Sequence, residues 1–357
     1  MDPETEPRWT RRPEGSTWGD FGPEDQRGRL NLLTAARVRR AAEEVREGRV
    51  FCLSLPLSLP GGNALNPWRH PPILCPVVRD GRLATNFRVD RTHAGATDVT
   101  NDDVVVLHLQ YSTQWDSLAH VGQLFDANGD GEPETVYYNG YRADVEIRGS
   151  AGCGDLRTGV NAREAPSEAS TMSADALGIE NMATACVQGR GVMIDLHAHL
   201  GRERSVVGYG LLMDIMRTDR VVVEEGDMVC LHTGFGDLLV ELGGRATPEV
   251  LHGSCAVLDG RDRRLLRWIT DSGVSVLVAD NYAVEGLPAK PGRTPCASLP
   301  LHEHCLFKLG VHLGELWHLS PLARWLREHE RARFLLTALP LRLPGAVGSP
   351  VTPVATV

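Results

Sequence analysis

Lysine is nearly absent from this 357-residue chain, in which Lys290 and Lys308 are the only lysines among 37 basic residues. Acidic residues number 46, so the formal net charge is −9, and the excess of acid is spread along the chain. Nucleic acids and anionic membrane surfaces are bound by a concentrated basic face. The sequence offers no such face, and we therefore expect neither kind of partner.

Long apolar runs and closely spaced cysteine pairs are missing as well. No uninterrupted apolar stretch approaches the ~18 residues of a membrane-spanning helix, and the polar, proline-containing start lacks the apolar core of a signal peptide. The eight cysteines are scattered, with no Cys-x-x-Cys pair. Several lie in apolar runs, where a reduced and buried thiol is the usual state. These features predict a cytoplasmic protein with free thiols.

Two sequence signatures of common enzyme classes are absent. There is no glycine-rich phosphate-binding loop of a nucleotide enzyme and no Gly-x-Ser-x-Gly turn of a serine hydrolase. The composition, with 42% hydrophobic and 23% charged residues, is nevertheless that of an ordinary packed globular protein. Any chemistry must therefore come from other residues.

The chain is predicted to form one α/β domain over residues 18–357. Residues 1–17 are polar and proline-bearing, which indicates a flexible or loosely docked tail. Beyond them, short β-branched runs are mixed with amphipathic segments, without internal repeats. Helices are expected at 33–47, 260–272, 300–309 and 321–329, and strands at 50–59, 104–109, 191–196, 227–233, 274–280 and 334–339.

The densest group of reactive side chains lies between Gln110 and His120. Asp116 precedes His120 by four residues, and a carboxylate beside an imidazole orients the ring and favours its protonated form, which suits acid–base chemistry. The carboxylate can instead hold a divalent metal. A structural interpretation, with Asp116 capping a helix and His120 in the core, is equally compatible with the spacing. The residues alone leave these alternatives open.

The same segment resembles the signature of the cyclase family, which includes bacterial kynurenine formamidase and isatin hydrolase. That signature is His-x-Gly-Thr-His-x-Asp-x-Pro-x-His. Thr113, Asp116 and His120 match it, whereas Gln110 and Gln114 stand at its first two histidines. The motif Ser-Thr-Gln-Trp-Asp is similar to one found in a branch of longer family members. The motifs at residues 18–32, 138–141, 280–285 and 340–350 resemble the same branch.

The resemblance implies the swivelling β/β/α fold of the family and a homodimer. It also implies that Asp116 is a ligand of a divalent metal, manganese or zinc, and that His120 is the acid–base residue. A later histidine and glutamate complete the metal site in the family. Here the glutamate is Glu315, and the histidine is His302 or His304, with a slight preference for His302.

The two glutamines weaken the expected metal site, because a neutral amide oxygen is a poorer ligand for zinc or manganese than an imidazole. Two arrangements stay open. A metal can be held through Asp116, a later histidine and Glu315, with oxygens of Gln110 and Gln114 assisting. Alternatively, the pocket is metal-free and the glutamines hydrogen-bond a substrate carbonyl.

Two further histidines, His197 and His199, follow the predicted strand 191–196 as His-Ala-His. Alternate residues of an extended segment point to the same side, so the pair can chelate a metal and compensate for the missing histidines. The interpretation that we favour is an ordinary surface loop. His232, at the end of another predicted strand, is expected either to pack in the core or to support a site residue without being part of the site itself.

The combined expectation is an enzyme that hydrolyses the C–N bond of a small cyclic or aryl amide. His120 would deprotonate the attacking water and protonate the leaving nitrogen, while Asp116 orients the reacting centre. One alternative is a metal-free cyclase or dehydratase that uses the same pair, and another is a non-catalytic binding protein. The predicted substrate contacts, of which the aromatic ones can equally belong to the core, are Gln110, Tyr111, Thr113, Gln114 and Trp115.

Overall fold

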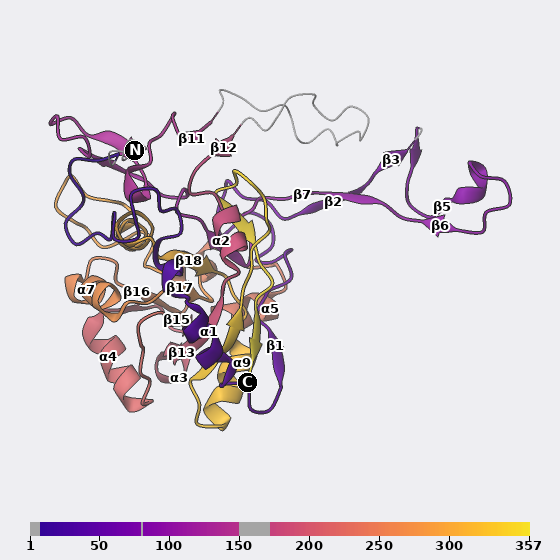
Figure 1. Cartoon of the computed structure of the whole chain (residues 1–357). Coiled ribbons are helices and arrows are strands. Elements are labelled where there is room, and N and C mark those ends of the chain that lie inside the picture. The colour runs from indigo at the N-terminus through magenta and orange to yellow at the C-terminus, as the bar shows by residue number, and fades with distance from the viewer. Residues whose placement is uncertain (1–7, 80, 150–171) are drawn as a thin grey trace.

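The computed structural model describes residues 8–79, 81–149 and 172–357. Its body is a nine-stranded mixed sheet with helices on both faces, and a narrow arm projects from it (Figure 1). The α/β class predicted from the sequence is confirmed. The cysteines in the described part of the chain are free thiols, as the scattered spacing predicts.

The sheet consists of β1 (Val50–Cys52), β8 (Gln114–Asp116), β13 (Gln188–Asp195), β15 (Met228–His232), β17 (Val276–Ala279), β18 (His312–Glu315), β19 (Arg333–Thr337), β20 (Gly348–Pro350) and β21 (Val354–Thr356). Their order is β1-β21-β19-β13-β15-β17-β18-β8-β20. The adjacent strands β13, β15, β17 and β18 are parallel, and the strands outside them are added antiparallel. The predicted β-branched runs form β13, β15, β17 and β19, whereas the run at 50–59 forms a strand only at its start.

The helices are α1 (Ala35–Ala42), α2 (Glu180–Ala185), α3 (Leu196–Leu200), α4 (Tyr209–Thr218), α5 (Phe235–Leu242), α6 (Pro248–Gly253), α7 (Arg263–Ser272), α8 (Pro300–His302) and α9 (Ser320–Glu328). In the described part of the chain they are accompanied by the 3₁₀ turns η1 (Gly28–Leu32), η2 (Val89–Arg91) and η3 (Tyr138–Gly140) and by the π-helical segment η5 (Glu303–Leu309). Thr34 caps α1 as predicted, since its side chain accepts a hydrogen bond from the Arg37 amide.

The two faces of the sheet carry separate apolar layers. On one face, α4, α7, α8 and η5 pack on side chains such as Ile194, Leu231, Leu277 and Leu313. On the other, α2 and α9 cover the alternate residues of the same strands. The alternation follows from the period of two in a strand. The position of a residue along its strand therefore decides which face of the sheet its side chain points to. We call the first the α7 face and the second the α9 face.

The arm is built from short paired strands between residues 73 and 106. Its base is the antiparallel pair of β2 (Ile73–Pro76) and β7 (Asp103–Val106), followed by β3 (Val78–Arg79), β4 (Arg82–Leu83), β5 (Phe87–Arg88) and β6 (Val99–Thr100). The predicted strand 104–109 is therefore part of this ribbon and not of the large sheet. Other small ribbons pair β9 (Gln123–Phe125) with β10 (Glu134–Val136), β11 (Ile147–Arg148) with β12 (Ser173–Ala174), and β14 (Ser205–Val207) with β16 (Ala256–Leu258).

The described part of the N-terminal segment is docked on the body. The Thr10 and Arg11 amides donate to the carbonyl of Ala127, and the Thr17 amide donates to that of Lys308. The flexible tail expected for residues 1–17 is therefore not seen from residue 8 onward, while residues 1–7 lie outside the described range.

A close backbone contact follows the N-terminal segment. The Arg29 amide donates to the Gly310 carbonyl at 2.8 Å, and a Cβ placed on Gly28, whose φ is +55°, would lie 2.1 Å from that oxygen. Because only glycine tolerates both the conformation and the contact, Gly28 fixes the N-terminal motif against the segment that follows η5.

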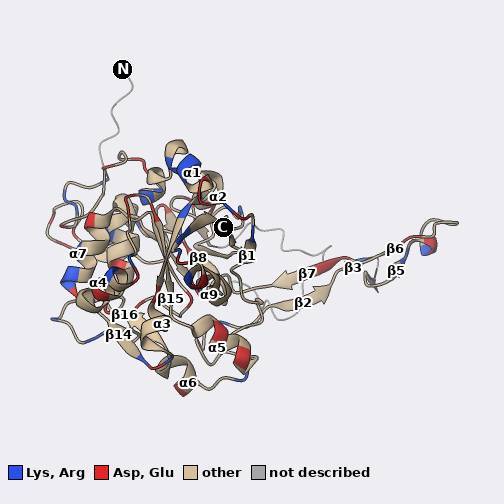
Figure 2. Cartoon of the chain, turned by 90° about the horizontal axis from the view of Figure 1, so that it is seen from below, with Lys and Arg blue, Asp and Glu red and all other residues tan. Residues whose placement is uncertain are grey.

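Charged residues of both signs are interspersed over the body and the arm (Figure 2). Among the described residues, none of the helices has the length and the apolar character needed to cross a membrane.

Trp115 lies on the α9 face of β8, the second strand from one edge of the large sheet. Its ring is fully buried and packs edge-to-face on Trp317, with centroids 5.1 Å apart. Its Nε1 donates to the carbonyl of Ala338 at 2.8 Å. The side chain therefore holds β8 in the sheet.

Replacing Trp115 with alanine should lower the free energy of unfolding by about 3–5 kcal/mol, because a large buried ring and its hydrogen bond are lost. Urea unfolding followed by circular dichroism measures the change. Trp68→Ala is the matched control, since Trp68 is 82% exposed and its loss should shift the stability by about 0.5 kcal/mol or less. Equal effects in the two variants would contradict the assignment of Trp115 to the core.

Candidate active site

Two carboxylates meet on the α7 face of the large sheet. In the antiparallel pair of β8 and β18, Gln114 is opposite Glu315 and Asp116 is opposite Leu313. Opposed residues of a ladder share a face, as do residues two apart on one strand. Gln114, Asp116 and Glu315 therefore point together into the layer that contains α8 and η5.

His302 completes this group from the covering layer. It ends α8 directly before the π-helical segment η5, and such wide turns are frequent at functional sites. Its Nε2 lies 3.3 Å from Glu315 Oε1 and 4.0 Å from Asp116 Oδ2. Its Nδ1 lies 2.8 Å from Oε1 of Glu285, a carboxylate that also accepts the backbone amides of Leu301 and His302. Glu285 thereby fixes the orientation of the imidazole.

The charges in this group follow from its burial. Burial raises the pKa of Asp116. Burial alone would lower the pKa of His302, but hydrogen bonds to Glu285 and Glu315 outweigh it and raise the pKa to about 10. Burial likewise opposes ionisation of Glu315, but the hydrogen bond and charge of His302 outweigh it and hold the pKa of Glu315 below its usual value. Without a metal, a proton on His302 therefore balances the carboxylates.

The group fits a divalent metal ion. The ligand atoms of Asp116, His302 and Glu315 all lie within 4.8 Å of one another. Asp116 Oδ2 and Gln114 Oε1 are buried without a hydrogen-bond partner, and an unpartnered buried acceptor calls for a missing donor or cation. Two carboxylates and an imidazole suit zinc or manganese. Binding would displace the proton from the imidazole, because a ligating histidine must be neutral.

Both glutamines of the signature lie near the group, in different ways. Gln114 Nε2 lies 3.2 Å from Asp116 Oδ1 and 3.4 Å from Glu315 Oε2, so its amide nitrogen donates to both carboxylates. Gln110 lies farther out, with its side-chain amide against Gly348, the residue opposite Asp116 on β20. The structure thus uses Gln114 to orient the carboxylates and leaves Gln110 at the rim.

His120 stands between the buried group and solvent. Its Nε2 lies 3.8 Å from Asp116 Oδ1, and its side chain is 21% exposed. That separation is too long for a hydrogen bond but close enough for the carboxylate to attract a protonated ring. The Asp116–His120 pair predicted from the sequence is therefore assembled, with only its histidine accessible.

The rim of the group contains residues that the sequence analysis did not single out. Gln110, Tyr111, Arg69 and Tyr282 line a small pocket. Arg69 donates to the Gln110 carbonyl at 2.7 Å, and its charge favours ionisation of both Asp116 and Glu315. Tyr111 is held by a 2.9 Å hydrogen bond from its hydroxyl to the Gly62 carbonyl. Leu316, which directly follows Glu315, also lines this pocket.

Two predicted substrate contacts are wrong. Trp115 is buried on the opposite face of β8. Thr113 is also fully buried, and its hydroxyl donates to the Leu316 carbonyl and accepts the Leu55 amide at 2.9 Å. Both side chains hold the strand in place and leave no surface for a substrate.

The remaining histidines lie elsewhere. His304 points to α7, where its Nε2 is 2.9 Å from the Thr270 hydroxyl, so His302 is the histidine of the group. His199 pairs with Asp219 at 2.9 Å, and His197 lies beside His232 on the other face of the sheet. Neither residue joins the group around Asp116, so the alternative in which they compensate for the missing histidines there does not hold. The favoured interpretation, a surface loop, is also wrong, because both residues lie in helix α3.

The sequence also contains a signal for Glu285, which the motifs above did not single out. Glu285 ends the Asp-Asn-Tyr-Ala-Val-Glu motif at 280–285, which follows a predicted buried strand, and a carboxylate directly after a buried strand is a candidate site residue. Arg69 and Tyr282 gave no comparable signal, since their approach to the group depends on loops.

Comparison with known proteins identifies the family and supports the fold. The Cyclase family model matches residues 53–286. A solved structure described as a novel cyclase is 29% identical, covers 96% of this chain and 97% of its own, and superposes with a TM-score of 0.71. Isatin hydrolase A from Ralstonia solanacearum, at 14% identity, covers 91% of this chain and 96% of its own with a TM-score of 0.52. Isatin hydrolase A from Labrenzia aggregata, solved with benzyl benzoate, shares 11% identity over 91% and 98% with a TM-score of 0.52.

A search of curated proteins found no match. The isatin hydrolases are too distant in sequence to show more than a common fold, and membership of the longer Ser-Thr-Gln-Trp-Asp branch stays a prediction. The family model, however, covers the greater part of the chain, including Asp116, His120 and Glu285. The chain belongs to the cyclase family.

Proposed function

We propose that the protein is a metal-dependent hydrolase that cleaves the C–N bond of a small cyclic or aryl amide. One observation carries the proposal: Asp116, His302 and Glu315 form a buried group that suits a divalent metal, and His120 stands beside it at the accessible side. The fold shared with the isatin hydrolases supports the substrate class.

Each residue of the group has a defined task in this reaction. Asp116, His302 and Glu315 would hold the metal, Glu285 orients His302, and Gln114 orients the two carboxylates. A bound zinc or manganese ion supplies Lewis acidity toward a carbonyl oxygen and lowers the pKa of water. The protein's own contribution is to keep this chemistry inside a buried, preorganised group.

His120 moves the protons. The oxygen of water adds to the amide carbonyl carbon while the imidazole accepts a proton from that water. The C–N bond then breaks, and the same imidazole returns the proton to the leaving nitrogen. The products are a carboxylic acid and an amine, and a cyclic amide opens to a single product that carries both. The rim formed by Gln110, Tyr111, Arg69 and Tyr282 would receive the remainder of the substrate.

A metal-free cyclase or dehydratase is the second candidate. The arrangement of Gln114 favours it, because an amide that donates to both carboxylates stands where the family signature has a metal-binding histidine. In that case His120 would move a proton without attack of water. The mass of the product separates the two reactions, since hydrolysis adds one water whereas cyclisation or dehydration adds none.

We also propose that the protein is a homodimer. The arm exposes apolar side chains and forms a narrow ribbon, and an isolated two-stranded ribbon is marginally stable without a surface to pack on. A second copy of the chain would provide that surface. The exposed side chains of the arm are Ile73, Leu74, Leu83, Val99 and Val105.

Light scattering should give the mass of a dimer for the intact protein. Leu74→Asp should shift the equilibrium toward monomer, because it places a charge in the buried contact, whereas Asp90→Asn at the same arm should not. A monomeric parent protein, or a dimer that Leu74→Asp leaves unchanged, would rule out the arm as the contact.

His120→Gln should reduce turnover of the amide substrate by about 10²–10⁴-fold, the usual contribution of a general acid–base residue. The melting temperature should change little, since the side chain lies at the accessible side of the site. His93→Gln, an exposed histidine of the arm, is the control and should keep full activity. Parent-like turnover in His120→Gln would remove the residue from the mechanism.

Exhaustive chelation should abolish activity, and zinc or manganese should restore it. His302→Ala should lose the one equivalent of metal held with Asp116 and Glu315, as measured by elemental analysis of the purified protein, because one of the three ligands is gone. His304→Ala, two residues along the same segment, should retain the metal. Full activity after chelation would instead support the metal-free candidate.

A further inference from the structure

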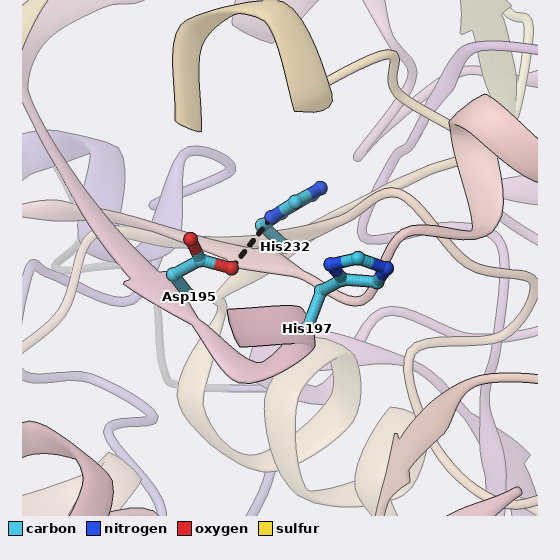
Figure 3. A group of neighbouring side chains, drawn as sticks. All are labelled: Asp195, His197 and His232. Atoms are coloured by element: carbon cyan, nitrogen blue, oxygen red, sulfur yellow. Dashed lines mark hydrogen bonds and ion pairs between the residues drawn. The ribbon is translucent and has the colours of Figure 1, made fainter. Parts of the chain in front are cut away.

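A second group of potential metal ligands lies on the α9 face of the sheet. Asp195 ends β13 and His232 ends β15, and the two residues are directly opposite each other in the parallel pair. His197 follows in the first turn of α3, whose start Asp195 caps through the Ala198 amide at 3.1 Å. Figure 3 shows the three side chains gathered at the ends of the strands. This group shares no residue with the one around Asp116.

The spacing of the three side chains suits a single ion. Their ligand atoms all lie within 4.8 Å of one another. His232 Nδ1 is 2.7 Å from Asp195 Oδ1, and the rings of His197 and His232 are 5.3 Å apart between centroids. A tetrahedral ion with bonds of about 2.0–2.2 Å separates its ligands by roughly 3.4 Å. Shifts of about 1 Å or less therefore bring the three atoms to these positions.

The imidazole of His197 has no hydrogen bond to any described residue, although its position is restricted. Its ring lies against Gly234, where an added Cβ would come 2.1 Å from its Cδ2. An imidazole held in place with free nitrogen atoms is suited to bind a metal.

The surroundings of the group add negative charge. Asp280, fully buried at the end of β17, has its Oδ2 4.0 Å from His232 Nε2. Arg327 offsets part of this negative charge, because its Nη1 lies 3.0 Å from Asp195 Oδ2. Its side chain is half exposed, however, and can turn toward solvent. His232 Nε2 is also 2.9 Å from the Ser320 hydroxyl, which can rotate to suit either protonation state of the ring. Two carboxylates thus face the histidines, against the charges of Arg327 and Arg202.

We propose that Asp195, His197 and His232 form a second metal site, selective for a zinc-class transition ion such as Zn²⁺ or Co²⁺. Two imidazoles and one carboxylate match the ligand preference of these ions, whereas Mg²⁺ and Ca²⁺ require more oxygen ligands. The ion replaces the proton shared between Asp195 and His232, and it ties the start of α3 to the ends of β13 and β15.

An access route to the group is present. A cavity of about 480 Å³ lies beside it, and its lining includes Asp195, Ala198 and Arg327. An ion can enter there, and water from the cavity can complete the coordination left open by three protein ligands. The site therefore needs no rearrangement of the fold to be filled.

Titration of chelator-treated full-length protein with Co²⁺ tests the proposal, with the stoichiometry read from equilibrium dialysis and the d–d absorption bands. The parent protein should bind one equivalent more than His197→Ala, whose affinity at this site should fall about 100-fold or further. His199→Ala is the matched control on the same helix, since His199 pairs with Asp219 outside the group, and it should bind as the parent does.

The two metal sites are distinguished by His302→Ala, which should lose the equivalent at Asp116 and keep the one at His197. Asp195→Asn provides a second variant, because asparagine preserves the cap on α3 while removing the charge, and it should also weaken Co²⁺ binding. The proposal is overturned when His197→Ala and Asp195→Asn both bind Co²⁺ as the parent does. It is also overturned when His302→Ala leaves no Co²⁺ bound.

Discussion

The burial of two carboxylates on neighbouring strands is the constraint on which the rest of the site depends. Asp116 and Glu315 face the same way because β8 and β18 are in a fixed register, and neither side chain reaches bulk water. Buried carboxylates are stable only with hydrogen bonds or an opposite charge. His302, with Glu285 behind it, and the amide of Gln114 provide this compensation. The same arrangement leaves one carboxylate oxygen, Oδ2 of Asp116, without a hydrogen-bond partner. That oxygen is free to bind a cation.

The sheet also separates two groups of potential metal ligands. The group around Asp116 lies on β8 and β18 and the group around Asp195 lies at the ends of β13 and β15, and the alternation of side chains sends the first to the α7 face and the second to the α9 face. A difference of one residue in register would exchange the faces. The fully buried Trp115, between Gln114 and Asp116, prevents such a slip because its ring fits only on the α9 side.

Local sequence patterns predict the fold class and part of the candidate site, but not the arrangement of the loops and the arm. The central strands, the Thr34 cap and the pairing of Asp116 with His120 follow from local patterns, and the structure contains them. The choice between His302 and His304 does not follow, because it depends on the π-helical turn that rotates one toward the sheet and the other toward α7. The arm was missed since its alternating residues give the same signal as a strand of the large sheet. Roles for Thr113 and Trp115 were wrong because a signature motif does not distinguish residues that bind a substrate from residues that hold the strand.

The docking of the N-terminal motif has a consequence for how the protein is made. Gly28 and Arg29 contact Gly310, Thr17 bonds to Lys308, and β1 pairs with β21. These contacts join segments separated by nearly the whole chain, and such closures are slow in folding. On a ribosome, the N-terminal motif emerges before its partner and waits until the segment around η5 has been synthesised. His302 lies in that same segment, so the group around Asp116 and the docking of the N-terminal motif are completed at the same stage of synthesis.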